Sequence, residues 1–345
     1  MNYDEILNNI RMLSRGETPG QDMTELLQKH NCGCLLSQEK RDLTADTLNK
    51  ICIGERFRAC KAVFAAFEEH NIPYAVIKGA VLSEMAYGDA FCRRSGDIDL
   101  LLLRDNIDRA KQIMLNCGFV QGRVTDEGIV PFNRRELLFQ ISASHQTAPF
   151  IKKTANPVCP YVNVDVNLDI FWGESDVKAD MSFVLEHTEC AEINGVKLKK
   201  LTPELEFIAL CLHHYKDANS IYLLWQKGLS LSLFCDIYFY LKNNRLNLQS
   251  LKAACRYLQA EDFVYYCIYY CNKIFNDNLL APYLETLKTE TSEQNLNTFG
   301  LDKAERKPWN ISFAERLFSG CLKQYFEKVL SPEDLQKIKI NHELM

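Results

Sequence analysis

The stretch DIDLLLL at Asp97–Leu103 places two carboxylates one residue apart, directly before an aliphatic run. Side chains alternate between the two faces of a β-strand, so Asp97 and Asp99 project to the same face and Ile98 to the other. Two carboxylates at a separation of about 4 Å repel each other by roughly 1 kcal/mol even in water. A shared cation relieves that repulsion, and hard oxygen ligands suit Mg²⁺ or Mn²⁺. The same pattern also describes a strand entrance whose two carboxylates are simply solvated.

The residues upstream of the acidic pair favour the metal interpretation. An apolar strand near 74–77 ends in Lys78-Gly79, and a short helix closed by glycine follows at 80–88. Arg94 lies in the connection to the acidic pair. The free N–H groups of a helix start and a guanidinium group both bind anionic oxygens. This order of elements predicts a phosphate site beside a metal site.

The pattern Lys78-Gly79, then Arg94-x-x-Asp97-Ile98-Asp99-Leu100-Leu101, resembles the signature of an uncharacterised nucleotidyltransferase family within the DNA polymerase beta superfamily. The superfamily's general pattern is Gly-Gly or Gly-Ser, about a dozen residues, and Asp-x-Asp or Asp-x-Glu. This sequence departs from it, because Ala80 replaces the second small residue and the gap from Gly79 to Asp97 is longer.

The resemblance implies an α+β fold, with a nucleotidyltransferase-like mixed sheet, flanking helices and a C-terminal helical domain. It also implies that an NTP, expected to be ATP, binds through Lys78, Gly79, Ser83 and Arg94. Gly79 permits close approach of the backbone to the phosphates.

The resemblance further implies a third carboxylate on a later strand. Within the stretch 161–172, residues 163–170 alternate strictly between polar and apolar, which gives one face that carries Asn163, Asp165, Asn167 and Asp169. The family usually has an acidic residue, an apolar residue and His-Trp there. Asp165 matches the acidic position, whereas Asn167 and Leu168 replace His-Trp. We therefore expect Asp165 to complete the catalytic and metal-binding set with Asp97 and Asp99, with Asp169 as a weaker substitute; a half-exposed antiparallel strand would show the same alternation.

The chain order predicts three consecutive parts: N-terminal helices over 1–45, the nucleotidyltransferase-like α+β domain over 46–200 and a helical domain over 201–345. Thr202-Pro203 suits the start of the helical part, with threonine as N-cap and proline at the first helical position. Further expected elements are helices at 55–70 and 106–117 and strands near 98–103, 136–142 and 162–170.

The helical part contains His213, Lys216 and Asp236. In related nucleotidyltransferases a helical bundle forms the far wall of the nucleotide cleft. By that resemblance Lys216 is expected to contact the phosphates, and His213 or Asp236 to line the acceptor side. The alternatives are a structural histidine and a helix-surface carboxylate.

Composition limits the possible partners. The net charge of −5 and the lack of a basic stripe argue against long nucleic acid as an acceptor. The most apolar segment, 221–241, contains Lys227 and Asp236, so we expect no membrane span. The N-terminus lacks the features of a signal peptide, which favours a cytoplasmic protein. The 14 cysteines are scattered through apolar stretches and are read as buried thiols, not zinc ligands.

Three functions fit this sequence. The first is a metal-dependent nucleotidyltransferase that moves a nucleoside monophosphate from an NTP to a hydroxyl or phosphate of a small-molecule, peptide or protein acceptor. The second is a catalytically degenerate protein of the same fold that binds a nucleotide or a partner, which the changes at Ala80, Asn167 and Leu168 would favour. The third is a metal-dependent phosphohydrolase that uses the same carboxylates.

Overall fold

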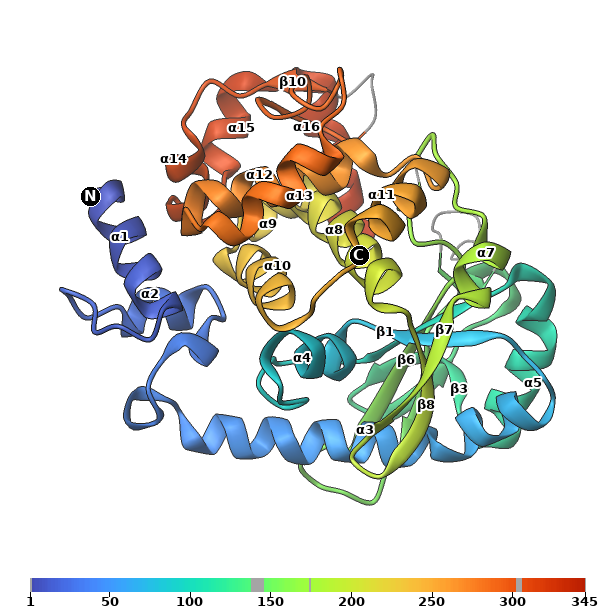
Figure 1. Ribbon diagram of the computed structural model, residues 1–345. Helices are drawn as coiled ribbons and strands as arrows, with labels where there is room; N and C mark the ends of the chain where they lie inside the picture. The colour runs from blue at the N-terminus through green and yellow to red at the C-terminus, as the bar shows by residue number, and fades with distance from the viewer. Residues whose placement is uncertain (1, 138–145, 174, 302–305, 345) are drawn as a thin grey trace. The chain divides into compact units, whose positions relative to one another are not determined.

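The computed structural model describes residues 2–344 except 138–145, 174 and 302–305 (Figure 1). Its contacts divide the chain into two compact units. Unit 1 comprises residues 1–37, 211–238 and 259–345, and unit 2 comprises residues 38–210 and 239–258. Both units are discontinuous in sequence, whereas the expected parts 1–45, 46–200 and 201–345 follow chain order.

Helices and strands alternate in the middle of the chain, and helices dominate both ends. The α-helices are α1 Tyr3–Ser14, α2 Thr24–Lys29, α3 Leu43–Glu69, α4 Gly79–Tyr87, α5 Ile107–Asn116, α7 Met181–Glu186, α8 Pro203–Asn219, α9 Ile221–Gln226, α10 Leu231–Asn243, α11 Leu248–Tyr257, α12 Glu261–Phe275, α13 Ala281–Leu287, α14 Phe313–Phe318, α15 Lys323–Val329 and α16 Pro332–Leu344. The strands are β1 Tyr74–Ile77, β2 Ile98–Leu102, β3 Val120–Thr125, β4 Gly128–Pro131, β5 Phe150–Lys153, β6 Tyr161–Asn167, β7 Thr188–Ile193, β8 Val196–Leu201, β9 Thr298–Phe299 and β10 Lys307–Pro308.

The centre of unit 2 is a mixed sheet with the strand order β1-β2-β6-β5-β3-β4. Strands β2 and β6 are parallel, and the other neighbouring pairs are antiparallel. Parallel neighbours need a long crossover, and the segment between β2 and β6 supplies it with α5, β3, β4 and β5. The expected mixed sheet with flanking helices and a C-terminal helical region is thus confirmed.

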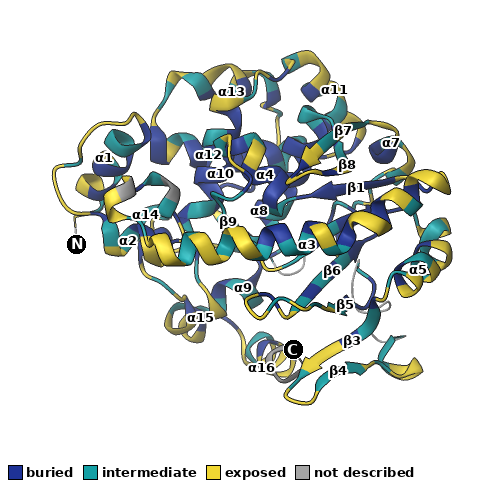
Figure 2. Ribbon diagram, turned by 90° about the horizontal axis from the view of Figure 1, so that it is seen from below, coloured by how far each residue is buried: buried dark blue, intermediate teal, exposed yellow. Residues whose placement is uncertain are grey.

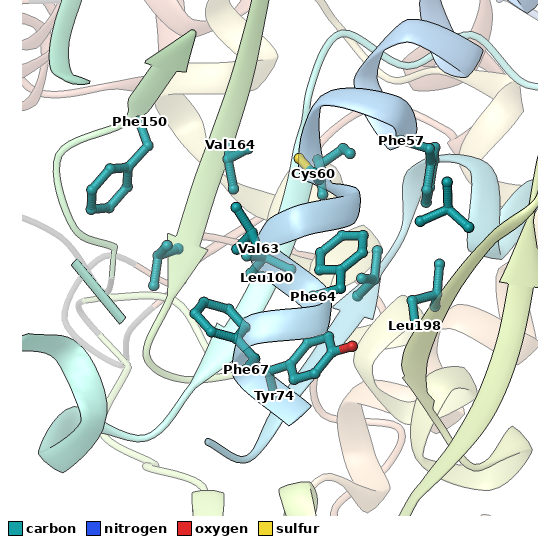
Figure 3. Close-up of a cluster of buried hydrophobic side chains, with 14 of the residues drawn as sticks. Phe57, Cys60, Val63, Phe64, Phe67, Tyr74, Leu100, Phe150, Val164 and Leu198 are labelled. Atoms are coloured by element: carbon teal, nitrogen blue, oxygen red, sulfur yellow. The ribbon is translucent and has the colours of Figure 1, made fainter. Parts of the chain in front are cut away.

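One face of this sheet is covered by the long helix α3. Asp42 caps its N-terminus by accepting a hydrogen bond from Ala45 N. Its buried residues Phe57, Val63 and Phe64 pack over Leu100 of β2 and Val164 of β6 (Figure 3). The opposite side of α3 is exposed (Figure 2). Apolar burial on this face leaves the alternate side chains of β2 and β6 for the other face.

Several elements differ from those expected. The predicted strand at 136–142 is not confirmed: residues 136 and 137 are helical, and 138–142 lie outside the described residues. Strands β3, β4, β5, β7 and β8 were not predicted. The strand expected over 162–170 is observed as β6, which ends at Asn167. The polar–apolar alternation of the sequence therefore continues beyond the end of the strand.

Unit 1 joins both ends of the chain. Arg11 on α1 donates from Nε to Ile274 O at 2.7 Å and from Nη2 to Lys273 O at 3.0 Å. These carbonyls belong to the last turn of α12, where four carbonyls lack helical partners and a cation is favourable. The N-terminal helices therefore pack with the C-terminal region. In the part of the chain that the structure describes, no helix is both long and apolar enough to cross a membrane.

Candidate functional site

Strand register brings two of the expected carboxylates side by side. Asp99 on β2 pairs in register with Asp165 on the parallel strand β6 and with Ile77 on β1. Register partners on adjacent strands, about 4.8 Å apart, project to the same face. Asp97 immediately precedes β2. The three carboxylates that the sequence predicted as a set therefore lie on, or directly before, two neighbouring strands.

Burial and mutual repulsion weaken the acidity of two of these carboxylates. Burial, followed by the charges of Asp97 and Asp99, raises the pKa of Asp165 to about 6. Burial, followed by the charge of Asp99, raises the pKa of Asp97, while Lys78 and Arg56 oppose the shift. The carboxylates are thus close enough to repel one another, which is the condition that a bound cation would relieve.

Lys78 lies between the sheet and α4 in an unusual conformation. Its φ of 58° and ψ of −150° belong to a region that is almost restricted to glycine. Its Nζ lies 3.0 Å from Asp99 Oδ1, so that the lysine ammonium already partly neutralises the acidic site. Helix α4 begins directly after it without a side-chain cap. First-turn N–H groups without a side-chain cap are groups that can bind anions.

Gly79 is held at a close approach to the loop before β2. A Cβ at this position would lie 3.0 Å from Ser95 Oγ, and the φ of Gly79 is 44°. Ser95 Oγ donates to Asp97 O at 3.0 Å, and Arg56 Nη1 donates to Ser95 O at 2.6 Å. The glycine thus lets the Lys78 turn pack against the segment that carries Asp97.

Asn167 is a site residue whose role the sequence did not reveal. It is 2% exposed, and its Nδ2 donates to Asp99 Oδ1 at 3.0 Å. Its Oδ1 accepts from Gln146 Nε2 at 2.8 Å. Asn167 therefore orients the Asp99 carboxylate from the strand that also carries Asp165. Asn167 stands at the position where the family pattern usually has histidine, and this was the feature of the sequence that could have indicated its role.

Glu206 on α8 is a second residue that sequence reasoning missed. It is 2% exposed, and its Oε1 accepts from Lys78 N at 3.2 Å. Its Oε2 is buried without a hydrogen-bond partner among the described residues. Burial, opposed by the Lys78 hydrogen bond, raises the pKa of Glu206 to about 7. Glu206 is flanked by the apolar residues Leu205, Phe207 and Ile208, and a carboxylate in such surroundings could have indicated a functional residue.

Ser83 and Arg94, both expected at the phosphates, have different surroundings. Ser83 is fully buried; its Oγ donates to Asp89 O at 2.6 Å and accepts from Arg93 N at 2.9 Å. These contacts fix the loop between α4 and β2. Arg94 is exposed. Asp169, the weaker alternative to Asp165, lies beyond the end of β6, and its Oδ1 accepts from Phe171 N and Ala179 N.

The three expected residues of the helical part all belong to unit 1. His213 Nε2 and Lys216 Nζ each lie 3.6 Å from the carboxylate of Asp217. Asp236 is 1% exposed, and its Oδ2 lies 3.3 Å from Nε2 of the equally buried His214. These contacts pair Asp236 with a histidine in the interior of unit 1 and place His213 and Lys216 around one carboxylate.

The space behind the Lys78 turn is small. A cavity of about 10 Å³ lies between α3 and the Gly79 and Asp97 backbone, which is room for about one water molecule. Within the described ranges, no three His, Cys, Asp or Glu side chains are arranged to hold a metal ion as they stand.

Comparison with known proteins places the chain in a family. Residues 25–276 match the family described as "Uncharacterised nucleotidyltransferase". The crystal structure of an antigenic nucleotidyltransferase-like protein from Paracoccidioides brasiliensis is similar at 18% sequence identity and a TM-score of 0.34, over 65% of this chain and 98% of that one. No curated protein matches the sequence. Because the family match spans most of the chain and includes the acidic site, the protein belongs to this family of uncharacterised nucleotidyltransferases.

Proposed function

We propose that the protein is a metal-dependent nucleotidyltransferase that moves a nucleoside monophosphate from an NTP, with ATP as the expected donor, to a hydroxyl or phosphate of a small-molecule, peptide or protein acceptor. The observation that carries this proposal is the register of Asp99 with Asp165 on parallel strands, beside Asp97 and the Lys78-Gly79 turn. Family membership supports the general reaction class.

The donor set suits a hard divalent cation. Asp97, Asp99 and Asp165 supply only carboxylate oxygens, and the raised pKa values of Asp97 and Asp165 reflect repulsion that a cation would relieve. These three residues would hold Mg²⁺ or Mn²⁺, which would supply charge neutralisation at the triphosphate. Since Lys78 Nζ occupies Asp99 Oδ1 in the structure, we expect it to leave that carboxylate for the phosphates when nucleotide binds.

Groups of the protein itself would bind the triphosphate and accept the proton of the acceptor. Lys78, Arg94 and the first-turn N–H groups of α4 would bind the triphosphate, and Gly79 would allow its close approach. Asp165, with a pKa of about 6, is ionised at neutral pH and would accept the proton of the acceptor hydroxyl. The acceptor oxygen would then bond to the α-phosphorus, and the bond from that phosphorus to pyrophosphate would break.

The proposed roles of the unit 1 residues Lys216 and His213 rest on the family resemblance alone. Lys216 is proposed to bind the phosphates and His213 to contact the acceptor. The burial of Asp236 against His214 favours a structural role for this carboxylate over contact with the acceptor. We expect His213→Ala to impair acceptor use more than NTP binding.

One observation favours the catalytically degenerate alternative as a second candidate. Asp99 Oδ1 is occupied by both the Lys78 ammonium and the Asn167 amide, and the described residues hold no converging metal cluster. A protein that had lost catalysis could retain such a self-neutralised site and still bind a nucleotide.

The phosphate product released from ATP separates the candidates. ATP labelled at the α- or the γ-phosphate would be incubated with Mg²⁺ and the metabolite and protein fractions of a lysate. Transfer predicts α-label on an acceptor and γ-label in pyrophosphate, both lost in Asp165→Asn and kept in the exposed control Asp105→Asn. Release of orthophosphate in every fraction would indicate the phosphohydrolase, and unchanged ATP would indicate the degenerate protein.

A further inference from the structure

We propose that Glu206 is a positioning residue, whose buried carboxylate holds the Lys78 backbone in the conformation from which the Lys78 side chain reaches the acidic site. The inference rests on the proposed function, because the Lys78 ammonium matters for catalysis only if it serves the triphosphate. It adds Glu206, from the first turns of α8, to the residues that the sheet and α4 contribute to the site.

The conformation of Lys78 needs external support. The other described non-glycine residues with positive φ are four asparagines and one glutamine, and Lys78 is the one lysine among them. Asparagine visits the left-handed helical region through its short polar side chain, as Asn276 does at φ 49° and ψ 54°, but Lys78 lies outside that region. A strained residue of this kind persists only where the surrounding structure fixes it, and such residues concentrate at functional sites.

Two contacts fix the two ends of Lys78. Its backbone N–H donates to Glu206 Oε1 at 3.2 Å, and its Nζ lies 3.0 Å from Asp99 Oδ1. The second contact involves the group that would move to the phosphates. The Glu206 contact involves only the backbone and can therefore persist while the side chain exchanges partners.

The burial of the Glu206 carboxyl group lowers the stability of the fold. It is 2% exposed, and its Oε2 has no hydrogen-bond partner among the described residues. Lys200, whose charge faces it from β8, pairs with Glu189 instead. Burying a carboxyl group with an unpaired oxygen is unfavourable, so an apolar residue would serve stability better. Among the described residues, the hydrogen bond that the Glu206 side chain accepts comes from Lys78 N–H, and this contact is a reason for a carboxyl group here.

Substitution of Glu206 separates positioning from packing. Glu206→Gln keeps an acceptor oxygen for Lys78 N–H, whereas Glu206→Met keeps the approximate shape without an acceptor. Glu204→Met, in the same turn of α8, serves as the matched control. Two readouts are needed: hydrogen–deuterium exchange resolved to the Lys78 amide in the free protein, and the dissociation constant for ATP with Mg²⁺ by calorimetry.

We expect faster exchange at Lys78 and about tenfold weaker ATP binding in Glu206→Met, which corresponds to one lost hydrogen bond. Glu206→Gln and Glu204→Met should retain wild-type values in both measurements. In a Lys78→Gly background, where glycine adopts the conformation unaided, Glu206→Met should weaken ATP binding less than about twofold.

Unchanged exchange at Lys78 in Glu206→Met would overturn the inference, as would faster exchange with unchanged ATP affinity. An equal loss of affinity in both backgrounds would assign Glu206 to packing alone and also contradict it. Absence of ATP binding by the wild-type protein would instead refute the proposed function, and the exchange measurement would still decide whether Glu206 holds the Lys78 backbone.

Discussion

At the scale of single residues, the acidic site is organised by how its negative charge is compensated. Asp99 is compensated by the Lys78 ammonium and the Asn167 amide, both 3.0 Å from its Oδ1. Asp97 and Asp165 are compensated less completely, and their pKa values are raised. Under the proposed function, this distribution of charge would lower stability in exchange for cation binding.

Asp97→Asn should therefore stabilise the free protein while it impairs the proposed activity. The amide removes a partly buried charge that Asp99 repels, so we expect the free energy of unfolding at pH 7 to rise by about 1 kcal/mol. Mg²⁺-dependent ATP binding should weaken. Urea unfolding and calorimetry measure the two effects, with Asp105→Asn as control. A clear loss of stability would show that Asp97 is a structural partner and not a repelled ligand.

Lys78 offers a test of backbone strain. Lys78→Ala and Lys78→Gly both remove the ion pair with Asp99, but only glycine relieves the unfavourable φ and ψ. After allowance for the greater entropy of glycine in the unfolded chain, we expect Lys78→Gly to be more stable than Lys78→Ala by about 1 kcal/mol. Thermal or urea unfolding of the two variants measures this difference. An alanine variant as stable as the glycine variant would mean that residue 78 is not strained.

The residue-scale predictions from sequence rest on local signals. The spacing of Asp97 and Asp99 and the alternation around Asp165 are properties of single strands, and the structure puts these carboxylates at neighbouring positions. Glu206 could not be located in this way, because it lies 128 positions from Lys78. Its contact exists only through the tertiary fold.

At the scale of elements, the parallel pairing of β2 with β6 brings the carboxylates of the candidate site together. Which strands could be predicted from the sequence depended on the turns that connect them. The β7–β8 hairpin was missed although Asn194-Gly195 connects its strands. Both residues have positive φ, as a two-residue hairpin turn requires. Strand β5 has only four residues, and two of them pair with β3. A segment this short shows little polar–apolar alternation in the sequence. The expected strand at 136–142 lacked any comparable turn signal.

The junction of α2 with α10 in unit 1 should make stability depend on pH. His30 at the C-terminus of α2 is 5% exposed, and its Nδ1 accepts from Leu231 N at 3.1 Å. Burial, followed by the charge of Lys29, lowers the pKa of His30 to about 4. Between pH 6.5 and 4 the unfolded chain binds a proton that the folded protein does not. Stability is therefore complete above pH 6.5 and falls as the pH decreases toward 4.

We expect this group to contribute up to about 3 kcal/mol of destabilisation at pH 4. His30→Gln, which retains an acceptor for Leu231 N, should flatten this part of the stability profile. The exposed His70→Gln should leave it unchanged. Urea unfolding at a series of pH values measures the profiles. Identical profiles for His30→Gln and the wild type would show that His30 is protonated normally in the folded protein.

At the scale of the whole molecule, chain order and compact units do not coincide. The sequence predicted three consecutive parts because changes in composition are visible only along the chain. Contacts instead group residues 1–37 with 211–238 and 259–345, and residues 239–258 with the sheet unit. Helices α8 and α10 each contribute residues to both units. The family match at 25–276 likewise includes residues of both units, so family membership does not rest on the sheet alone.

The most direct test of the central claim is the mass of the acceptor. A lysate fraction would be incubated with ATP, Mg²⁺ and either the wild type, Asp99→Asn or the control Asp105→Asn, and analysed by untargeted mass spectrometry. Nucleotidyl transfer predicts that the wild type and the control add the mass of one adenosine monophosphate minus water to a specific compound or protein. Asp99→Asn should produce no such increase. An increase of the same size with Asp99→Asn, or ATP consumption by the wild type without any modified acceptor, would contradict the account.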